Sequence, residues 1–367
     1  MNTSNEAPLK GILVADFTTL LPGPVATLML AEAGAEVIKV EKPGGEDMRA
    51  YPPQWDGISA AFAMLNRGKK SLVVDLKNDE GRKAARELAA KADVLVEQFR
   101  PGVMQRHGLG YDELSKINPK LIYCSITGYG QSGPKRDEAG HDLNYIGATG
   151  LLSLAPGHAD NPVVPPALIA DIGGGTFPAV TNILLALIAR GKTGKGAYID
   201  IAMADAMFTF AWMAFATLQA TGKQAGPASL STTGGSPRYQ IYPTKDGKLV
   251  CCGALEQKFW AAFCATIGLP QEFTNDFKNP SATKQAIRDI IAKETAAHWK
   301  PKFAAADCCV TIMATLEEAL ADEHFVKRGL FSEQLASAGG DKQIPALPVP
   351  IAPAFRVKGA RSYPRVK

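Results

Sequence analysis

Short apolar runs alternate with helical patterns over the first two hundred residues. Runs of strand length occur at Gly11–Phe17, Glu36–Glu41, Ser71–Leu76, Ala92–Val96, Leu121–Ile126 and Ala197–Ile201. Helical spacing occurs between them, at Val25–Glu32, Asp79–Ala92, Asp112–Ile117 and Phe177–Arg190. This alternation is typical of an α/β fold with a parallel sheet and helices on its faces. We therefore predict a doubly wound, Rossmann-like domain. Its ligands should bind in the loops that follow Phe17, Glu41, Val96 and Ile126, beyond the carboxyl ends of the strands.

The pattern changes after a stretch rich in Gly, Ser, Thr and Pro, Thr221–Gly235. Two short apolar runs flank an Asp246-Gly247 pair, which is a strong hairpin signal, and helical patterns follow. We predict four parts: a large domain that begins with 1–220, a linker at 221–235, a small α+β domain at 236–330, and a tail, 331–367, that returns to the large domain. The chain of 367 residues is long enough for two domains.

The longest apolar run, Ala206–Leu218, is shorter than the ~20 residues of a membrane span. We predict a buried helix there, Asp205–Gln219, and no membrane span. The N-terminus lacks a hydrophobic signal core, and the six cysteines include no CxxC pair. This usage predicts a cytoplasmic protein with no disulfide framework and no metal site. The net charge is only +4 and the basic residues are scattered along the chain, so nucleic acid is not an expected partner.

Two features of the first domain carry weaker hypotheses. Glu41 ends the second predicted strand, where dinucleotide-binding folds place an acid for the ribose, but the preceding turn lacks G-x-G-x-x-G. A nicotinamide cofactor is therefore a weak alternative. The basic turn Leu65–Lys70 is either a solvated surface turn or a phosphate clamp.

The most reactive stretch runs from Gly140 to Gly175. His141 and Asp171 stand on either side of a connector rich in Gly and Pro. They could serve as two bases, or Asp171 alone could be a nucleophile that forms an acyl anhydride. The structural alternative is a loop histidine and a helix-capping aspartate, and the spacing does not choose among these readings.

Ordered blocks along nearly the whole chain carry a family resemblance. They are DFTTLLPGPVATLMLAEAGAEVIKVEKP, NRGKKSLVVDLK, ADVLVEQFRPGVMQRHGLGYDEL, LIYCSITGYGQSGP, AGHDLNY, ADIGGG, ARGKTGKGAYIDIAMADA, TGGSPRYQIYPTKDGKLVCCGALEQKF and DCCVTIM. The chain resembles the family III CoA-transferases (CaiB/BaiF-like), and within them the α-methylacyl-CoA racemases. The resemblance implies an interlocked homodimer with a Rossmann-like large domain and a smaller α+β domain. It implies an acyl-CoA substrate that brings its own coenzyme A, with no other bound cofactor.

Three catalytic residues follow from the resemblance: His141, Asp171 and Glu256. Transferases of the group use the aspartate as a nucleophile and generally lack the histidine, whereas racemases pair the two. The racemase glutamate lies in a GAxEPQF-like block, which reads GALEQKF here, so Gln257 or Lys258 replaces its proline. In a racemase, His141 and Asp171 would face opposite sides of the α-carbon and Glu256 would orient the imidazole. Gly173–Gly175 would begin a helix whose N–H groups suit an oxyanion.

The resemblance also points to residues that bind CoA. They are Lys42, Val74, Asp75, Leu76, Lys77, Gln98, Phe99, Arg100, Arg106, Gly140, Asp142, Asn144 and Tyr145. We expect Arg100 and Arg106 at the phosphates.

Met203, Met207 and Met213 are either part of an adaptable acyl pocket or core residues. Three functions compete: a 2-methylacyl-CoA racemase, a CoA-transferase working through Asp171, and an acyl-CoA-binding module without turnover.

Overall fold

The computed structural model describes residues 7–158 and 161–366, which form two compact units. Unit 1 comprises Met1–Thr149, Ala167–Thr209 and Glu323–Lys367. Unit 2 comprises Gly150–Pro166 and Phe210–Asp322. The break near residue 210 falls about ten residues before the predicted end of the first domain segment, and the return to unit 1 begins at Glu323 rather than at 331.

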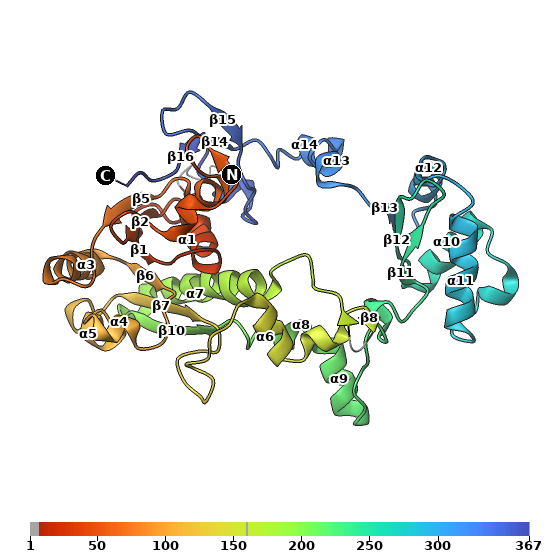
Figure 1. Cartoon of the computed structure of the whole chain (residues 1–367), viewed down its shortest axis with the longest axis horizontal. Coiled ribbons are helices and arrows are strands. Elements are labelled where there is room, and N and C mark those ends of the chain that lie inside the picture. The colour runs from red at the N-terminus through yellow and green to blue at the C-terminus, as the bar shows by residue number, and fades with distance from the viewer. Residues whose placement is uncertain (1–6, 159–160, 367) are drawn as a thin grey trace. The chain divides into compact units, whose positions relative to one another are not determined.

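A six-stranded sheet is the centre of unit 1 (Figure 1). Its strands, in spatial order, are β10 (Ala197–Ala202), β7 (Ile122–Thr127), β6 (Val94–Glu97), β1 (Leu13–Phe17), β2 (Glu36–Glu41) and β5 (Lys70–Val73). All five pairings between neighbours are parallel. Chain order reverses between β1 and β6, as it does at the switch point of a doubly wound sheet. The predicted Rossmann-like fold is confirmed.

Helices cover both faces of the sheet because its central strands are apolar on both sides. Every residue of β6 and β7 is buried. On one face, α3 (Asp79–Lys91), α4 (Val103–Arg106) and α5 (Tyr111–Ile117) pack around Leu95 and Tyr123. On the other face, α1 (Pro22–Glu32) packs against β1, β2 and β6, and α7 (Phe177–Thr193) packs against β7 and β10.

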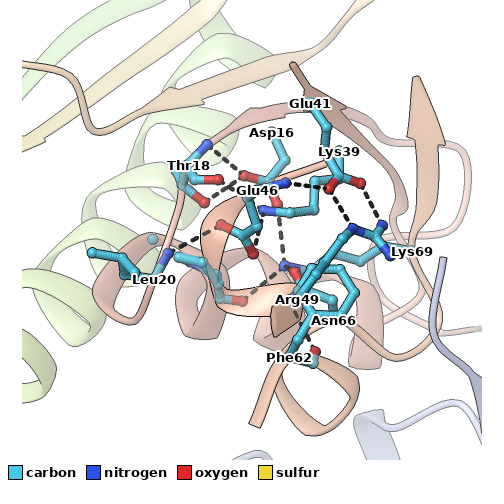
Figure 2. A network of polar contacts seen from close by, with 12 residues as sticks. Asp16, Thr18, Leu20, Lys39, Glu41, Glu46, Arg49, Phe62, Asn66 and Lys69 are labelled. Carbon is cyan, nitrogen blue, oxygen red and sulfur yellow. Dashed lines mark hydrogen bonds and ion pairs between the residues drawn. The ribbon is translucent and has the colours of Figure 1, made fainter. Parts of the chain in front are cut away.

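A buried charge network fixes the loop that follows β1 (Figure 2). The Asp16 carboxylate accepts hydrogen bonds from the backbone N–H and hydroxyl of Thr18, and it pairs with Lys69 Nζ at 3.1 Å. Lys39 Nζ donates to Thr18 O at 2.8 Å and lies 3.4 Å from a carboxylate oxygen of Glu46. The other Glu46 oxygen accepts the N–H of Leu20 at 3.2 Å. The Thr18–Leu20 backbone is therefore held from both sides.

The basic turn Leu65–Lys70 is neither a solvated turn nor a phosphate clamp, and both interpretations were wrong. Lys69 lies fully inside the Asp16 network. Arg67 is buried and donates to Glu32 at 2.9 Å and to the carbonyl of Leu347 at 2.7 Å. Its charge meets an acid from a distant helix, and a local sequence pattern does not reveal such a pairing.

The C-terminal tail lies against the N-terminal part of unit 1 (Figure 1). It forms a small sheet of β15 (Gln343–Pro345), β14 (Gln334–Ala336) and β16 (Arg361–Ser362). Leu335 and Tyr363 join a core cluster with Phe62 of α2 (Ala60–Asn66). Arg361 binds the same Glu32 carboxylate as Arg67, at 2.9 Å. Apolar packing and this shared acid tie the tail to the sheet domain.

Unit 2 contains a separate core, as expected of a small α+β domain. The hairpin β11 (Tyr239–Pro243) and β12 (Leu249–Gly253) turns at the predicted Asp-Gly pair, and β13 (Val310–Ile312) extends the antiparallel sheet. Three helices pack against the sheet: α10 (Gln257–Ile267), α11 (Pro280–Ile291) and α12 (Ala296–Ala306). Trp260, Phe263, Trp299 and Phe303 fill the core between them.

The predicted buried helix at Asp205–Gln219 is wrong. The segment breaks into α8 (Met207–Phe210) and α9 (Trp212–Thr221), with the boundary between the units beside the break. None of the described residues of α9 is buried, and Trp212 and Phe215 are 63% and 53% exposed in the single chain. Apolar composition predicts that a helix packs against another surface, but it does not identify that surface.

One helix among the described residues is long and apolar enough to cross a membrane. It lies outside Ala206–Leu218, the longest apolar run of the sequence. This helix, Ala170–Thr193, has a mean hydropathy of 1.6 and includes α7. It packs against α1, β7 and β10. We interpret it as the helix that covers this half of the sheet.

Candidate active site

A cavity of about 440 Å³ lies at the carboxyl edge of the large sheet. Loops after three strands line it, with Leu20 and Leu21 from the β1 loop, Gln98–Pro101 from the β6 loop and Ile126–Gly128 from the end of β7. His141, Asp171 and Met203 also line it. Three of the four loops that the sequence singled out therefore meet at this cavity, the loop after Glu41 does not, and His141 and Asp171 belong to the same cavity.

His141 is held at the start of a short helix, α6 (Asp142–Ala148). Its backbone N–H donates to the Asn144 side chain at 3.0 Å, as an N-cap residue's does in a capping box. The hydroxyl of Tyr145 donates to Gly140 O at 2.5 Å and fixes the preceding residue. The imidazole itself is on an exposed residue that faces the cavity. Three of the predicted CoA contacts, Gly140, Asn144 and Tyr145, thus line the cavity and also position His141.

Asp171 lies in the first turn of η3 (Ala170–Thr176), a π-helical turn that continues into α7. Such turns are rare and concentrate at functional sites. The backbone N–H of Asp171 donates to Asp142 Oδ1 at 2.9 Å, and Asp142 is buried. Burial, together with the charge of Asp142, raises the pKa of Asp171 to about 6, although His141 acts in the opposite direction. A carboxyl group with this pKa can both accept and return a proton near neutral pH.

Asp142 has a different position from the one the resemblance implied. It does not line the cavity; its carboxylate faces the backbone of Asp171 instead. It anchors the start of the helix and places a negative charge near the reactive carboxylate.

The glycine run after Asp171 permits close packing. A Cβ on Gly174 would lie 2.3 Å from the carbonyl oxygen of Met203, and Gly175 lies against Met203 and Pro22. The helix begins before these glycines, at Ala170, so the run lies inside it rather than at its start. The expectation that Gly173–Gly175 begin the helix and present an oxyanion site is not met.

A second cavity, of about 400 Å³, lies on the other side of Phe99, which lines both. Besides Phe99, five predicted CoA residues line it: Lys42, Val74, Asp75, Leu76 and Lys77. Sequence reasoning missed Glu46, Tyr51 and His107 here and Arg136 in the first cavity. The spacing of Glu46 and Tyr51 after the β2 strand was the signal that could have pointed to them, since this loop follows the carboxyl end of a strand.

Other predicted residues have varied positions. Arg100 lines the first cavity, and Gln98 Oε1 accepts the N–H of Gly23 at 3.0 Å, which links the β6 loop to α1. Arg106 is exposed at the end of α4 and lines neither cavity.

Glu41 is bound by Arg49 at 2.6 Å and by the Ser71 hydroxyl at 2.7 Å, so its carboxylate is already engaged. Of the methionines, Met203 lines the cavity and Met207 is fully buried beside Gly174. Met213 belongs to unit 2, where its sulfur contacts the hydroxyls of Ser231 and Thr232.

Glu256 belongs to unit 2, where it is the exposed N-cap residue of α10. Its side chain makes no capping hydrogen bond to that helix. Within the described residues, no group of three or more His, Cys, Asp and Glu side chains is arranged to hold a metal ion.

Comparisons with known proteins agree with the geometry of this edge. The model of CoA-transferase family III matches residues 9–365. The α-methylacyl-CoA racemase of Mus musculus is 37% identical over 339 residues, covering 90% of this chain and 84% of its own. The acetyl-CoA:oxalate CoA-transferase of Acetobacter aceti is 38% identical over 306 residues, covering 80% of this chain and 77% of its own.

Solved structures give the same result. A CaiB/BaiF family protein from Brucella suis superposes with a TM-score of 0.81 at 30% identity, covering 98% of this chain and 97% of its own. Sequence, fold and the carboxyl-edge cavity agree, and the chain belongs to CoA-transferase family III.

Proposed function

We propose that this protein is a racemase that interconverts the two enantiomers of a 2-methylacyl-CoA thioester. The observation that carries the proposal is the presence of His141 and Asp171 in one cavity, with the pKa of Asp171 raised to about 6. Racemisation needs two proton-transfer groups that bracket one carbon, and this pair supplies an imidazole and a poised carboxyl group. The racemase relative at 37% identity supports the same reading.

The proposed reaction has two proton transfers. One of the two groups, as a base, takes the α-proton, and the electron pair of the C–H bond moves into the thioester as an enolate. The other group, as an acid, then gives a proton to the opposite face of the same carbon. Asp171 and His141 exchange these roles when the other enantiomer is the substrate. We assign Glu256 the support of the protonated imidazole, since a nearby carboxylate favours the charged form.

The cavities suggest where the coenzyme A part of the substrate binds. We propose that its nucleotide occupies the Lys42–Val74–Lys77 cavity and that the thioester reaches His141 and Asp171 past Phe99, which, like Leu20, lines both cavities. Arg100 and Arg136 add positive charge beside the first cavity, where phosphate oxygens can be bound. No cofactor other than this coenzyme A enters the proposal.

We also propose that the protein works in the cytoplasm as an interlocked homodimer. Apolar side chains on α7 and α9 support this, because Leu185, Ile188, Trp212 and Phe215 are all exposed in the single chain. Large exposed apolar side chains on a helix are typical of protein interfaces. Light scattering should give twice the chain mass of 39.0 kDa.

The test is incubation of one pure enantiomer of a 2-methylacyl-CoA in D₂O, followed by NMR at the α-carbon and chiral analysis. Deuterium incorporation with loss of optical purity is the expected result. His141→Ala should retain exchange for one enantiomer only, without inversion, and Asp171→Asn should retain it for the other. Retention of the α-hydrogen by the wild-type protein with either enantiomer would contradict the proposal.

A second function has its own support. The oxalate CoA-transferase at 38% identity is as similar as the racemase, which supports a role for Asp171 as a nucleophile that attacks a thioester. That attack would form an aspartyl anhydride and release the CoA thiolate. Hydroxylamine would convert the anhydride to a hydroxamate on Asp171, detectable by peptide mass spectrometry. A hydroxamate without α-deuteration would favour the transferase.

A further inference from the structure

Glu256 lies in a segment that the rest of unit 2 holds rigidly on both sides. The Arg238 guanidinium donates to the carbonyl of Leu255 at 3.1 Å and to the Gln257 side chain at 3.0 Å. These are the two residues that flank Glu256. One guanidinium therefore binds the backbone carbonyl immediately before the glutamate and the side chain of the residue immediately after it.

Arg238 is itself fixed by a buried acid and by aromatic rings. Asp276 accepts from Arg238 Nη2 at 2.7 Å and from Nε at 3.0 Å, and the two residues are 7% and 2% exposed. The guanidinium carbon lies 5.0 Å from the Trp260 ring centroid, and Trp260 N–H donates to Glu256 O at 2.9 Å. Because the guanidinium group is planar and hydrogen-bonded on two of its sides, the groups that it binds have little freedom to move.

The Glu256 carboxylate makes no capping hydrogen bond to its own helix. N-cap positions favour Ser, Thr, Asp and Asn, whose short side chains bond the first turn, and Glu is not among them. Here the Glu256 side chain makes no capping bond and lies exposed. The local structure thus holds the backbone firmly and leaves the carboxylate available to another group.

We propose that Arg238, held by Asp276, is a positioning residue that fixes the segment from which the Glu256 carboxylate extends. The inference rests on the proposed function, in which Glu256 supports the protonated His141. Arg238 touches no reacting atom; it acts through the backbone carbonyl of Leu255 and the side chain of Gln257. The sequence replaces the proline of the GAxEPQF-like block with Gln257, the first residue of α10, and the side chain of this residue provides one of the two tethers.

The experiment measures racemisation of a 2-methylacyl-CoA against pH for the wild-type protein, Glu256→Gln, Arg238→Lys, Gln257→Ala and the Arg238→Lys/Glu256→Gln double variant. Lysine keeps the charge but loses the fork, so Arg238→Lys should lower kcat on the order of 10-fold with KM within about 2-fold. It should change the pH profile in the same way as Glu256→Gln. The double variant should be no slower than Glu256→Gln alone, because both changes remove one function.

Two comparisons keep the result interpretable. Gln257→Ala alters an exposed side chain and leaves the Arg238–Asp276 pair intact. If circular dichroism shows that Arg238→Lys is unfolded, this variant tests the positioning role in its place. A reduced kcat is expected. Arg190→Lys is the matched control, because it changes an arginine–aspartate pair, with Asp93, at the opposite edge of the large sheet. It should leave kcat and the pH profile unchanged.

The outcomes separate the two proposals. A slow Glu256→Gln with a normal Arg238→Lys and Gln257→Ala would overturn the inference and leave the proposed function standing. An additive loss in the double variant would also overturn it. Wild-type protein that exchanges no α-hydrogen, or a fully active Glu256→Gln, would overturn the role of Glu256 and with it the inference.

Discussion

Asp16 and Asp171 are both enclosed carboxyl groups of the large unit, but their surroundings shift their pKa values in opposite directions. Burial alone would raise the pKa of Asp16, yet Lys69, Lys39 and two threonine hydroxyls outweigh it and hold that pKa below the usual range. Asp171 is less buried, but burial and the like charge of Asp142 raise its pKa to about 6. The sign of the neighbouring charge, more than the depth of burial, separates the two.

The difference matches what each region does. The Asp16 network holds Thr18–Leu20 in place, and Leu20 lines both cavities (Figure 2). A permanently charged, fully bonded acid suits this structural task. Asp171 has only its backbone anchored, by Asp142, and its carboxyl group faces a cavity. An acid with a raised pKa suits proton transfer.

Asp171→Asn should show the largest effect, a loss of kcat for racemisation of about 10²–10⁴-fold, because an amide does not exchange the proton. The fold should persist, since the backbone N–H that bonds Asp142 is retained. Chiral analysis of the product measures the rate, and circular dichroism checks the fold. Racemisation at more than a tenth of the wild-type rate would remove Asp171 from the proposed mechanism.

Lys69→Met should destabilise the fold by about 3–5 kcal/mol, because it leaves Asp16 buried without its closest cation. Lys70→Met, at the next residue, is the matched control. Lys70 forms an exposed ion pair with Glu36, so its loss should change the free energy of unfolding by less than about 1 kcal/mol. Urea denaturation measures both variants, and equal destabilisation would contradict the contrast between buried and exposed pairs.

Asp142→Asn should make Asp171 a stronger acid. The amide oxygen can still accept the N–H of Asp171, but the negative charge that raises the pKa of Asp171 is gone. That pKa should therefore fall from about 6 toward the usual range for aspartate. If ionised Asp171 is the base for one enantiomer, the acidic limb of kcat/KM for that enantiomer should move to lower pH. An unmoved limb would mean that another group determines it.

The smallest expected effect is on stability against pH. The pKa of Asp171 is raised on folding, so its contribution favours the folded state below pH about 4 and is lost as the pH rises through about 6. Asp171→Asn removes this loss. After discounting for partial solvent exposure, the variant should be more stable than wild type by up to about 1 kcal/mol at pH 8. The difference should vanish near pH 3.5, and urea titrations at the two pH values give the comparison.

The sequence by itself determined the elements and the family. The period of apolar residues located Glu36–Glu41 with its observed bounds, and the Asp-Gly pair located the β11–β12 hairpin. The alternation of strands and helices gave the doubly wound class and the loops that line the cavities. These features are predictable because they depend on local periodicity and on turn chemistry, both of which are written in consecutive residues.

Only the tertiary structure decided how charged and apolar side chains are partnered. It placed Lys69 beside Asp16, Arg67 beside Glu32, Asp142 against the backbone of Asp171, and Arg238 around Glu256. It also left the apolar α9 exposed where a buried helix was predicted. Each of these outcomes depends on residues between 17 and 53 positions apart, or on a surface that one chain does not supply. Ion pairing and burial are properties of the assembled fold, and short-range patterns do not carry them.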